Sequence, residues 1–249
     1  MPVPLSENFE ALVYGYPRLP ERWDATVLLI DKPKGITSFD VIRRLRKLLR
    51  VRKIGHAGTL DPMATGLLIC LIGQATRWMT HFMAQEKEYE GVMRLGEITP
   101  SYDAETEVVE RRPWEHLTDE DLERARWQFV GEIVQQVPAY SAVKVGGKRL
   151  YEQARAGKEV ERPSRRVQIY AFELLGRKGP DVAFRVCCSK GTYIRSLVHD
   201  FGQVLGCGAH LIELRRTRSG PYRVEQAWTL EALAEALQAR TSSQPERKS

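Results

Sequence analysis

The sequence is organised around residues 55–68, which read GHAGTLDPMATGLL. Three glycines give positions where the backbone can adopt positive φ or approach a ligand closely: Gly55, Gly58 and Gly66. Pro62 biases the preceding Asp61 towards an extended conformation. The stretch therefore predicts a loop that holds one carboxylate in a fixed orientation. The alternative is an ordinary turn, since Asp and Gly are common turn residues.

The residues around Asp61 include polar side chains before it and a predicted strand after it. His56 offers a ring that can stack or donate a hydrogen bond, and the Thr59 hydroxyl can bond locally to the backbone. The apolar run 67–72 that follows predicts a buried strand. An acid on a glycine-rich loop beside a sheet is typical of an active site.

Length and composition limit the number of domains and the class of protein. At 249 residues and 43% hydrophobic residues, the chain is long enough for one large domain or two small ones. No apolar run reaches the length of a membrane span, and residues 1–24 lack a basic region followed by an apolar core. We therefore expect a cytoplasmic protein with no membrane association.

The four cysteines lack paired CxxC spacing and lie in apolar or glycine-flanked segments: Cys70, Cys187, Cys188 and Cys207. This pattern favours buried thiols over disulfides or a zinc site. We expect neither a metal nor a cofactor, and no GxGxxG or GxxxxGK[ST] pattern indicates nucleotide binding.

Positive charge is concentrated just upstream of the glycine-rich loop. The formal charge is +6, and seven basic residues lie within eleven positions: Arg43, Arg44, Arg46, Lys47, Arg50, Arg52 and Lys53. In the same segment four apolar residues recur at helical spacing: Val41, Leu45, Leu48 and Leu49. The segment predicts an amphipathic helix capped by Thr37 or Ser38, with a basic face that binds phosphates. The alternative is a solvated helix face, which usually mixes charges of both signs.

Further elements follow from periodicity and from turn residues. Strands are expected at residues 27–31, 87–96, 132–137, 167–175 and 182–188, and helices at 74–83, 119–129, 192–205 and 229–239. Thr118 and Thr192 are the expected caps of two of these helices, and residues 176–181 the expected turn between two strands. Lys144 belongs to a second basic cluster with Lys148, Arg149 and Arg155, which is either solvated surface or an RNA backbone contact.

The loop 55–68 resembles the catalytic loop of the TruB family of tRNA pseudouridine-55 synthases. Three further stretches resemble motifs of the same family: LLIDKPKGITSFDV at 28–41, KEYEGVMRLG at 87–96 and CSKGTYIR at 188–195. The resemblance implies an α+β pseudouridine synthase fold, with a large mixed β-sheet flanked by helices and an RNA-binding cleft. It implies isomerisation of uridine to pseudouridine in the T-loop of tRNA, without a cofactor and with a flipped base.

The resemblance also implies roles for particular residues. Asp61 would be the nucleophile, Arg195 its ionic partner, Tyr193 a neighbour of that pair, and Tyr89 the ring that stacks on the target base. Leu214 would form an apolar wall of the base pocket. The substrate-binding set would also include His56, in the space that the base vacates, and Lys87, Thr59, Arg43, Arg46, Lys47 and Lys144. The alternatives are purely structural roles: cross-strand packing for Tyr89 and a surface position for Arg195.

The expected organisation is an N-terminal arm at 1–24, either mobile or adding a strand, a catalytic domain at 25–240 and a disordered tail at 241–249. We expect no complete C-terminal RNA-binding domain of the PUA type. We expect a monomer that acts on the T-arm of tRNA without an obligatory protein partner. Two alternatives remain: a guide-RNA-dependent synthase of the dyskerin type, and a catalytically silent RNA-binding protein.

Overall fold

The computed structural model describes residues 12–141, 143–156 and 161–242. The predicted arm is thus described only from Leu12 and the predicted tail only to Ser242; the rest of both lies outside the described residues. The chain divides into two compact units: residues up to Gln85 together with those from Arg216 onward, and Glu86–Arg215. None of the helices in the described part is long and apolar enough to cross a membrane.

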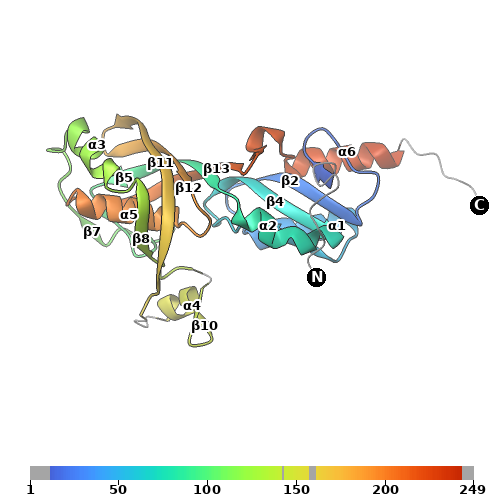
Figure 1. Ribbon diagram of the computed structural model, residues 1–249, viewed down its shortest axis with the longest axis horizontal. Helices are drawn as coiled ribbons and strands as arrows, with labels where there is room; N and C mark the ends of the chain where they lie inside the picture. The colour runs from blue at the N-terminus through green and yellow to red at the C-terminus, as the bar shows by residue number, and fades with distance from the viewer. Residues whose placement is uncertain (1–11, 142, 157–160, 243–249) are drawn as a thin grey trace, which may run out of the picture. The chain divides into compact units, whose positions relative to one another are not determined.

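The first unit is built on part of a mixed sheet in the order β1-β2-β4-β13 (Figure 1). Its strands are β1 (Val13–Tyr14), β2 (Ala25–Lys32), β3 (Ile54–Ala57), β4 (Thr65–Gly73) and β14 (Tyr222–Arg223), together with the end of β13 (Ala209–Ser219). β1 runs parallel to β2, whereas β2 and β3 are antiparallel to β4. The predicted arm therefore adds a strand at Val13–Tyr14.

Both faces of β2 and β4 are buried, which explains why the run 67–72 is continuously apolar. On one face Leu28, Ile30, Leu68, Cys70 and Ile72 pack against α1 (Ser38–Leu49) and against Trp228, Leu230 and Leu233. On the other face Val27, Leu29, Leu67, Ile69 and Leu71 pack against Ala75, Phe82 and Val224. The helical elements beside these faces are η2 (Gln74–Trp78), α2 (Met79–Ala84), η3 (Val224–Gln226) and α6 (Leu230–Ser242).

Helix α1 confirms the amphipathic prediction. Thr37 is its N-cap and forms a capping box with Asp40, which satisfies free N–H groups of the first turn. The apolar stripe includes Ile42 in addition to the predicted residues, but Leu48 is 38% exposed and was wrongly assigned to it.

The second unit contains the sheet order β13-β5-β12-β11-β8, with antiparallel pairing of β5 to β12, β12 to β11 and β11 to β8. Its elements are β5 (Lys87–Leu95), β6 (Glu97–Ile98), β7 (Glu110–Arg111), α3 (Asp119–Trp127), β8 (Gly131–Gln136), β11 (Ser164–Lys178), β12 (Asp181–Cys188) and α5 (Ile194–Val204). Helices α3 and α5 contact each other, and they contact β11 and β8 respectively. The excursion between β8 and β11 carries β9 (Lys144–Val145), β10 (Lys148–Arg149) and α4 (Leu150–Arg155), and it projects away from the strands of this unit (Figure 1).

Two local predictions in this part of the chain were wrong, and one strand was missed. The expected turn at 176–181 is only a two-residue connection, because Lys178 still pairs with Asp181. Tyr193, not Thr192, is the N-cap of α5, since the Thr192 hydroxyl instead donates to the Ser189 carbonyl oxygen at 2.9 Å. Strand β13 was not predicted, because its arginines, one of them the buried Arg216, and its preceding Gly206 and Gly208 obscure the alternation.

Replacement of Gly66 by alanine tests the close packing beside the Asp61 loop. Gly66 has φ of 101°, and a Cβ there would lie 2.3 Å from the Arg216 carbonyl oxygen. We expect Gly66→Ala to lower the free energy of unfolding by roughly 3 kcal/mol, since left-handed strain adds to a backbone clash. Gly179→Ala is the matched control, because Gly179 has φ of 61° but nothing within 4 Å of the added Cβ. Equal losses for the two variants in urea unfolding would contradict the packing argument.

Candidate functional site

Asp61 lies on a short loop, residues 58–64, between β3 and β4. Gly58 and Gly66 have positive φ, as predicted, and the Ala64 amide donates to the Asp61 carbonyl oxygen at 3.1 Å. Gly55 is different: it lies in β3, and a Cβ there would meet Met79 Cε at 2.5 Å. The predicted loop is therefore shorter at its start, and Gly55 serves packing.

The residue before Asp61 is fixed by Ser38 in the first turn of α1. The Ser38 hydroxyl donates to the Leu60 carbonyl oxygen at 3.0 Å and accepts from the Leu60 amide at 2.9 Å. Ser38 and Leu60 are both buried, so water does not compete for these bonds.

The residue after Asp61 is contacted by Lys32. The Lys32 ammonium donates to the carbonyl oxygens of Pro33 at 2.9 Å, Ile36 at 2.7 Å and Pro62 at 3.4 Å. The Gly35 amide also donates to the Pro62 oxygen, at 2.8 Å. The lysine is fully buried, so these carbonyls replace the water that its charge loses.

Arg216 fixes the start of the loop. Its guanidinium, on a residue that is 1% exposed, donates to the carbonyl oxygens of Leu67 at 2.7 Å and Gly58 at 3.0 Å. Three buried polar side chains thus hold the backbone around Asp61. Sequence reasoning missed Lys32, Ser38 and Arg216, although a lone Lys that ends an apolar strand is a usable signal.

Of the two predicted substrate-binding residues here, His56 lies in β3 and Thr59 lies in the loop itself. Burial and the charge of Arg216 lower the pKa of His56, which makes its ring neutral at pH 7. Among the described residues the buried Nδ1 of His56 has no hydrogen-bond partner. Thr59 is exposed.

The basic face of α1 belongs to the same unit as Asp61. Arg43, Arg46 and Lys47 are exposed, as predicted for residues that contact phosphates. Arg43 forms an ion pair with Asp40, and Arg46 donates to the Ile54 carbonyl oxygen at 3.2 Å.

In the second unit Arg195 lies in the first turn of α5 and is 4% exposed, so the surface alternative is wrong. Its guanidinium donates to the carbonyl oxygens of Ser101 and Tyr140, each at 3.0 Å. Its Nε lies 3.5 Å from Asp103 Oδ2. Buried acceptors on several sides therefore orient this guanidinium.

Asp103 is a candidate that sequence reasoning passed over. The other oxygen of its carboxylate accepts from the Ser101 hydroxyl at 2.5 Å and from the Glu105 amide at 3.0 Å. Thr99, Ser101 and Asp103 are all buried, so these polar side chains are packed inside this unit.

Tyr193, at the N-cap of α5, is positioned by the buried amide of Gln135. Gln135 Oε1 accepts from the Tyr193 amide at 3.0 Å, and its Nε2 donates to the Tyr193 carbonyl oxygen at 3.2 Å. The Arg165 guanidinium lies 5.0 Å from the centre of the Tyr193 ring.

The remaining predicted site residues of this unit lie on strands. Tyr89 and Lys87 are buried on β5, where they pair with Val186 and Cys188 of β12, and Leu214 is buried on β13. Lys144 lies in β9, but its side chain is outside the described part of the structure.

The segment that contacts Arg195 is also held by an aromatic stack. Tyr102 has φ of 65°, rare for a residue other than glycine, and its ring stacks on His199 of α5 at 3.8 Å and 16°. Arg162 donates to the Tyr102 hydroxyl at 3.0 Å. The stack therefore fastens residues 101–103 to the helix that carries Arg195.

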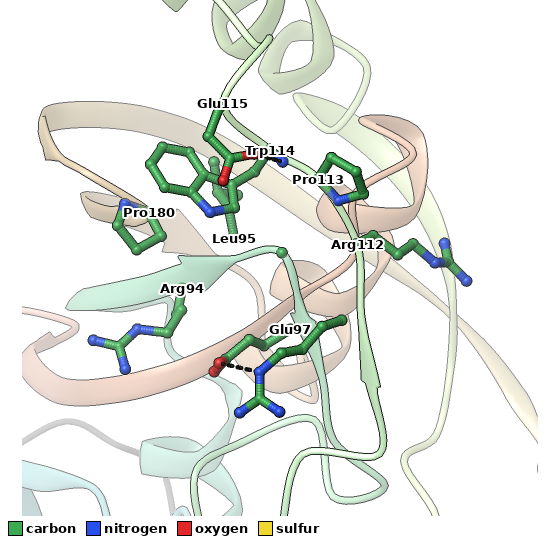
Figure 2. Close-up of a pocket in the computed structure, with 10 residues that line it drawn as sticks. Arg94, Leu95, Glu97, Arg112, Pro113, Trp114, Glu115 and Pro180 are labelled. Carbon is green, nitrogen blue, oxygen red and sulfur yellow. Dashed lines mark hydrogen bonds and ion pairs between the residues drawn. The ribbon is translucent and has the colours of Figure 1, made fainter.

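A pocket of about 420 Å³ in the second unit lies apart from these residues (Figure 2). Trp114, Pro113 and Pro180 form its apolar side. Its arginines are paired with carboxylates: Arg94 with Asp181, Arg111 with Glu97 and Arg112 with Glu110. None of the predicted site residues lines it. Among the described residues no group of three His, Cys, Asp or Glu is placed to hold a metal ion.

Comparison with known proteins matches residues 46–247 to two sequence families. Residues 46–194 match the TruB family pseudouridylate synthase N-terminal domain, and residues 195–247 match the tRNA pseudouridylate synthase B C-terminal domain. A tRNA pseudouridine synthase B of Burkholderia lata is 51% identical over 88% of this chain and 68% of the relative. One of Opitutus terrae is 49% identical over 85% of this chain and 87% of the relative.

Two solved structures are similar in fold. A crystal structure of a Cbf5-Nop10-Gar1 complex matches with a TM-score of 0.67 and 36% identity, over 86% of this chain and 54% of that one. A structure of an H/ACA RNP bound to a substrate RNA containing 2'-deoxyuridine matches with a TM-score of 0.67 and 31% identity, over 90% and 57%. This chain thus spans little more than half of either matched protein.

The neighbours His199 and Asp200 on α5 generate a prediction about pH. Burial, assisted by Arg162 and Arg112, lowers the pKa of His199 from 6.5 to about 4, so its contribution to stability is lost as pH falls through that range. Burial raises the pKa of Asp200 from 3.8 to about 6, so its contribution is lost as pH rises through that range. Between pH 6 and pH 4 the two slopes oppose each other, each at most about 1.4 kcal/mol per pH unit before solvent screening.

We therefore expect His199→Gln to make the free energy of unfolding rise on acidification from pH 6 to pH 4, relative to wild type. Asp200→Asn should make the free energy of unfolding fall on the same acidification, relative to wild type. Urea unfolding at several pH values measures both slopes. Parallel pH profiles for the two variants would contradict the opposed titrations.

Proposed function

Because the chain belongs to the TruB family of pseudouridylate synthases, we propose that it converts uridine to pseudouridine at position 55 in the T-loop of tRNA. The names of the relatives support tRNA as the substrate, since they are tRNA pseudouridine synthases that align over most of this chain. We place the reaction in the cytoplasm.

The reaction is an isomerisation whose atoms balance without a cofactor. The bond between uracil N1 and sugar C1′ breaks, the base turns, and C5 bonds to C1′. The proton on C5 leaves, and N1 gains one. A single carboxylate can assist by attacking C1′ or uracil C6, or by helping to form a glycal at the sugar. All three routes need an ionised acid held at the sugar or the base.

Asp61 is the proposed nucleophile, and the observation that carries this assignment is the way its loop is held. Leu60 on one side and Pro62 on the other are bonded by Ser38 and Lys32 through their backbones. Such contacts fix the backbone that carries the carboxylate. Preorganised groups avoid the cost of reorganisation during the reaction.

Arg195 is the proposed partner that keeps Asp61 ionised and oriented, and Asp103 is proposed to position Arg195. A guanidinium with donors in a fixed plane can serve both carboxylates, while Ser101 and Tyr140 occupy further donors. Tyr193 would pack beside the pair, and Tyr89 would stack on the flipped uracil. Leu214 would be the apolar wall of the base pocket.

The neutral ring of His56 is proposed to fill the space that the uridine leaves, since an uncharged ring can stack between bases. Thr59 and Lys87 complete the base site. Arg43, Arg46, Lys47 and Lys144 would bind phosphates of the T-arm. We propose that the chain acts as a monomer and without a protein partner.

One alternative is supported by a specific observation. One of the matched structures, 31% identical, is an H/ACA RNP bound to a substrate RNA, and it supports a guide-RNA-dependent reaction as the alternative. The two proposals differ in what the purified chain needs: a guide RNA and partner proteins, or tRNA alone.

The proposed substrate is tested with a T-arm hairpin. Because RNA loops are recognised by shape and by splayed bases, we expect the purified chain to modify the hairpin with kcat/KM within about tenfold of whole tRNA. Nuclease digestion to oligonucleotides, followed by chromatography, would show whether the product lies at position 55 of the T-loop. An inert hairpin with active whole tRNA would show that recognition extends beyond the T-arm, and inertness of both would contradict the proposed function.

The proposed roles are tested by two variants that preserve size or charge. Asp61→Asn removes the charge and should abolish product while tRNA affinity stays within about tenfold, because affinity rests on phosphate contacts. Arg195→Lys should lower kcat severely, because an ammonium cannot reproduce planar bidentate pairing. Single-turnover rates at saturating enzyme measure both. Turnover by Asp61→Asn would exclude the nucleophile assignment, and a wild-type rate for Arg195→Lys would exclude the pairing.

A further inference from the structure

Phe39 is an exposed aromatic side chain on the basic face of α1. It is 59% exposed, whereas the apolar residues Val41, Ile42, Leu45 and Leu49 of the same helix are buried. The buried stripe therefore does not need Phe39, and neither the fold nor the proposed catalytic chemistry accounts for an aromatic ring at this place.

The ring lies in line with the arginines of the helix. Phe39, Arg43 and Arg46 are spaced by four and three residues, which places them on one stripe of an α-helix. The Arg46 guanidinium lies 5.6 Å from the centre of the Phe39 ring. This cation–π contact restrains the ring from one side. A strand of RNA whose phosphates follow the arginines would reach Phe39 at the N-terminal end of the stripe.

That end of α1 is tied to the Asp61 loop. Ser38, the neighbour of Phe39, makes both of its hydrogen bonds to Leu60, the neighbour of Asp61. The backbone carrying the ring and the backbone carrying the carboxylate are therefore joined by two buried hydrogen bonds. A base on Phe39 would belong to a nucleotide close to the reacting one.

We propose that Phe39 is a stacking platform for one unpaired base of the RNA substrate, next to the reacting uridine, with Arg46 holding the ring and a neighbouring phosphate. Aromatic rings beside a basic track are how proteins bind splayed single-stranded bases, because every base has a face that can stack. The inference rests on the proposed function for the identity of the RNA. If Phe39 stacks on a base, part of the RNA-binding free energy is non-ionic and does not come from the arginines.

The test is hairpin binding and modification by Phe39→Ala, with Phe39→Trp as the conservative variant. We expect Phe39→Ala to raise Kd and KM about tenfold, with little change in the single-turnover rate at saturating enzyme. Phe39→Trp should retain wild-type Kd. The slope of log Kd against log salt should stay unchanged in Phe39→Ala, since no charge is removed, but flatten when Arg43, Arg46, Lys47 and Arg50 become Gln.

Trp127→Ala is the matched control. Trp127 is 63% exposed and has the Arg126 guanidinium 4.2 Å from its ring, but it ends a helix whose first turn is acidic. We expect it to bind the hairpin like wild type. Thermal unfolding of all three single variants checks that the fold is intact.

Abasic substitution in the hairpin loop identifies the stacked base. At one position next to the target uridine, removal of the base should weaken hairpin binding by the wild-type protein about tenfold. The same removal should leave binding by Phe39→Ala unchanged, which is the signature of a direct interaction. Wild-type affinity for Phe39→Ala, or additive losses at every loop position, would overturn the proposal. A wild-type protein that binds the hairpin but forms no pseudouridine would instead refute the proposed function, and the abasic cycle would still decide the role of Phe39.

Discussion

The buried ammonium of Lys32 sets the conformation on which the Asp61 loop depends. A charge at a fully buried position is tolerated only where acceptors replace water, and here three backbone carbonyls do so. Two of them belong to the turn before α1 and one to Pro62. The lysine therefore ties the end of β2, the start of the basic helix and the Asp61 loop together. Ser38 and Arg216 act in the same way on Leu60 and Gly58.

In the second unit, buried acceptors stabilise the charge of Arg195 in a similar way. A buried guanidinium loses its hydration, and the carboxylate of Asp103 and the carbonyls of Ser101 and Tyr140 compensate for that loss. Asp103 is in turn satisfied by Ser101 and the Glu105 amide. Tyr102 keeps its unusual φ because His199 and Arg162 hold its ring. Buried polar contacts thus hold the backbone beside Asp61 in the first unit and the side chain of Arg195 in the second.

Sequence reasoning recovered the elements whose signal is local. Strand β4 was readable as a continuous apolar run, and α1 and α3 were readable from Thr37 and Thr118, whose capping boxes the structure confirms. It failed where contacts between residues distant in the sequence determine the local structure. Thr192 has the chemistry of a cap, but its hydroxyl turns back to Ser189, and Tyr193 is fixed instead by Gln135 from β8. No local pattern reveals that partner.

The same distinction applies to the site. Asp61 was identifiable because glycines, a proline and a family motif surround it in the chain. Lys32, Ser38 and Arg216 support it from three separate segments, so their roles emerge only once the chain is folded. Phe39 was not singled out from the sequence, because its exposure and its contact with Arg46 are apparent only in the structure.

The central claim is that the chain exchanges an N–C for a C–C glycosidic bond in tRNA with Asp61 as the essential acid. Its most direct measurement is tritium release from a tRNA transcript labelled at uracil C5, with purified protein and no added cofactor. Bond formation at C5 must expel that hydrogen, so the account predicts release of one equivalent per tRNA by wild type and none by Asp61→Asn. Wild-type protein that binds the transcript but releases no tritium, or equal release by both proteins, would contradict it.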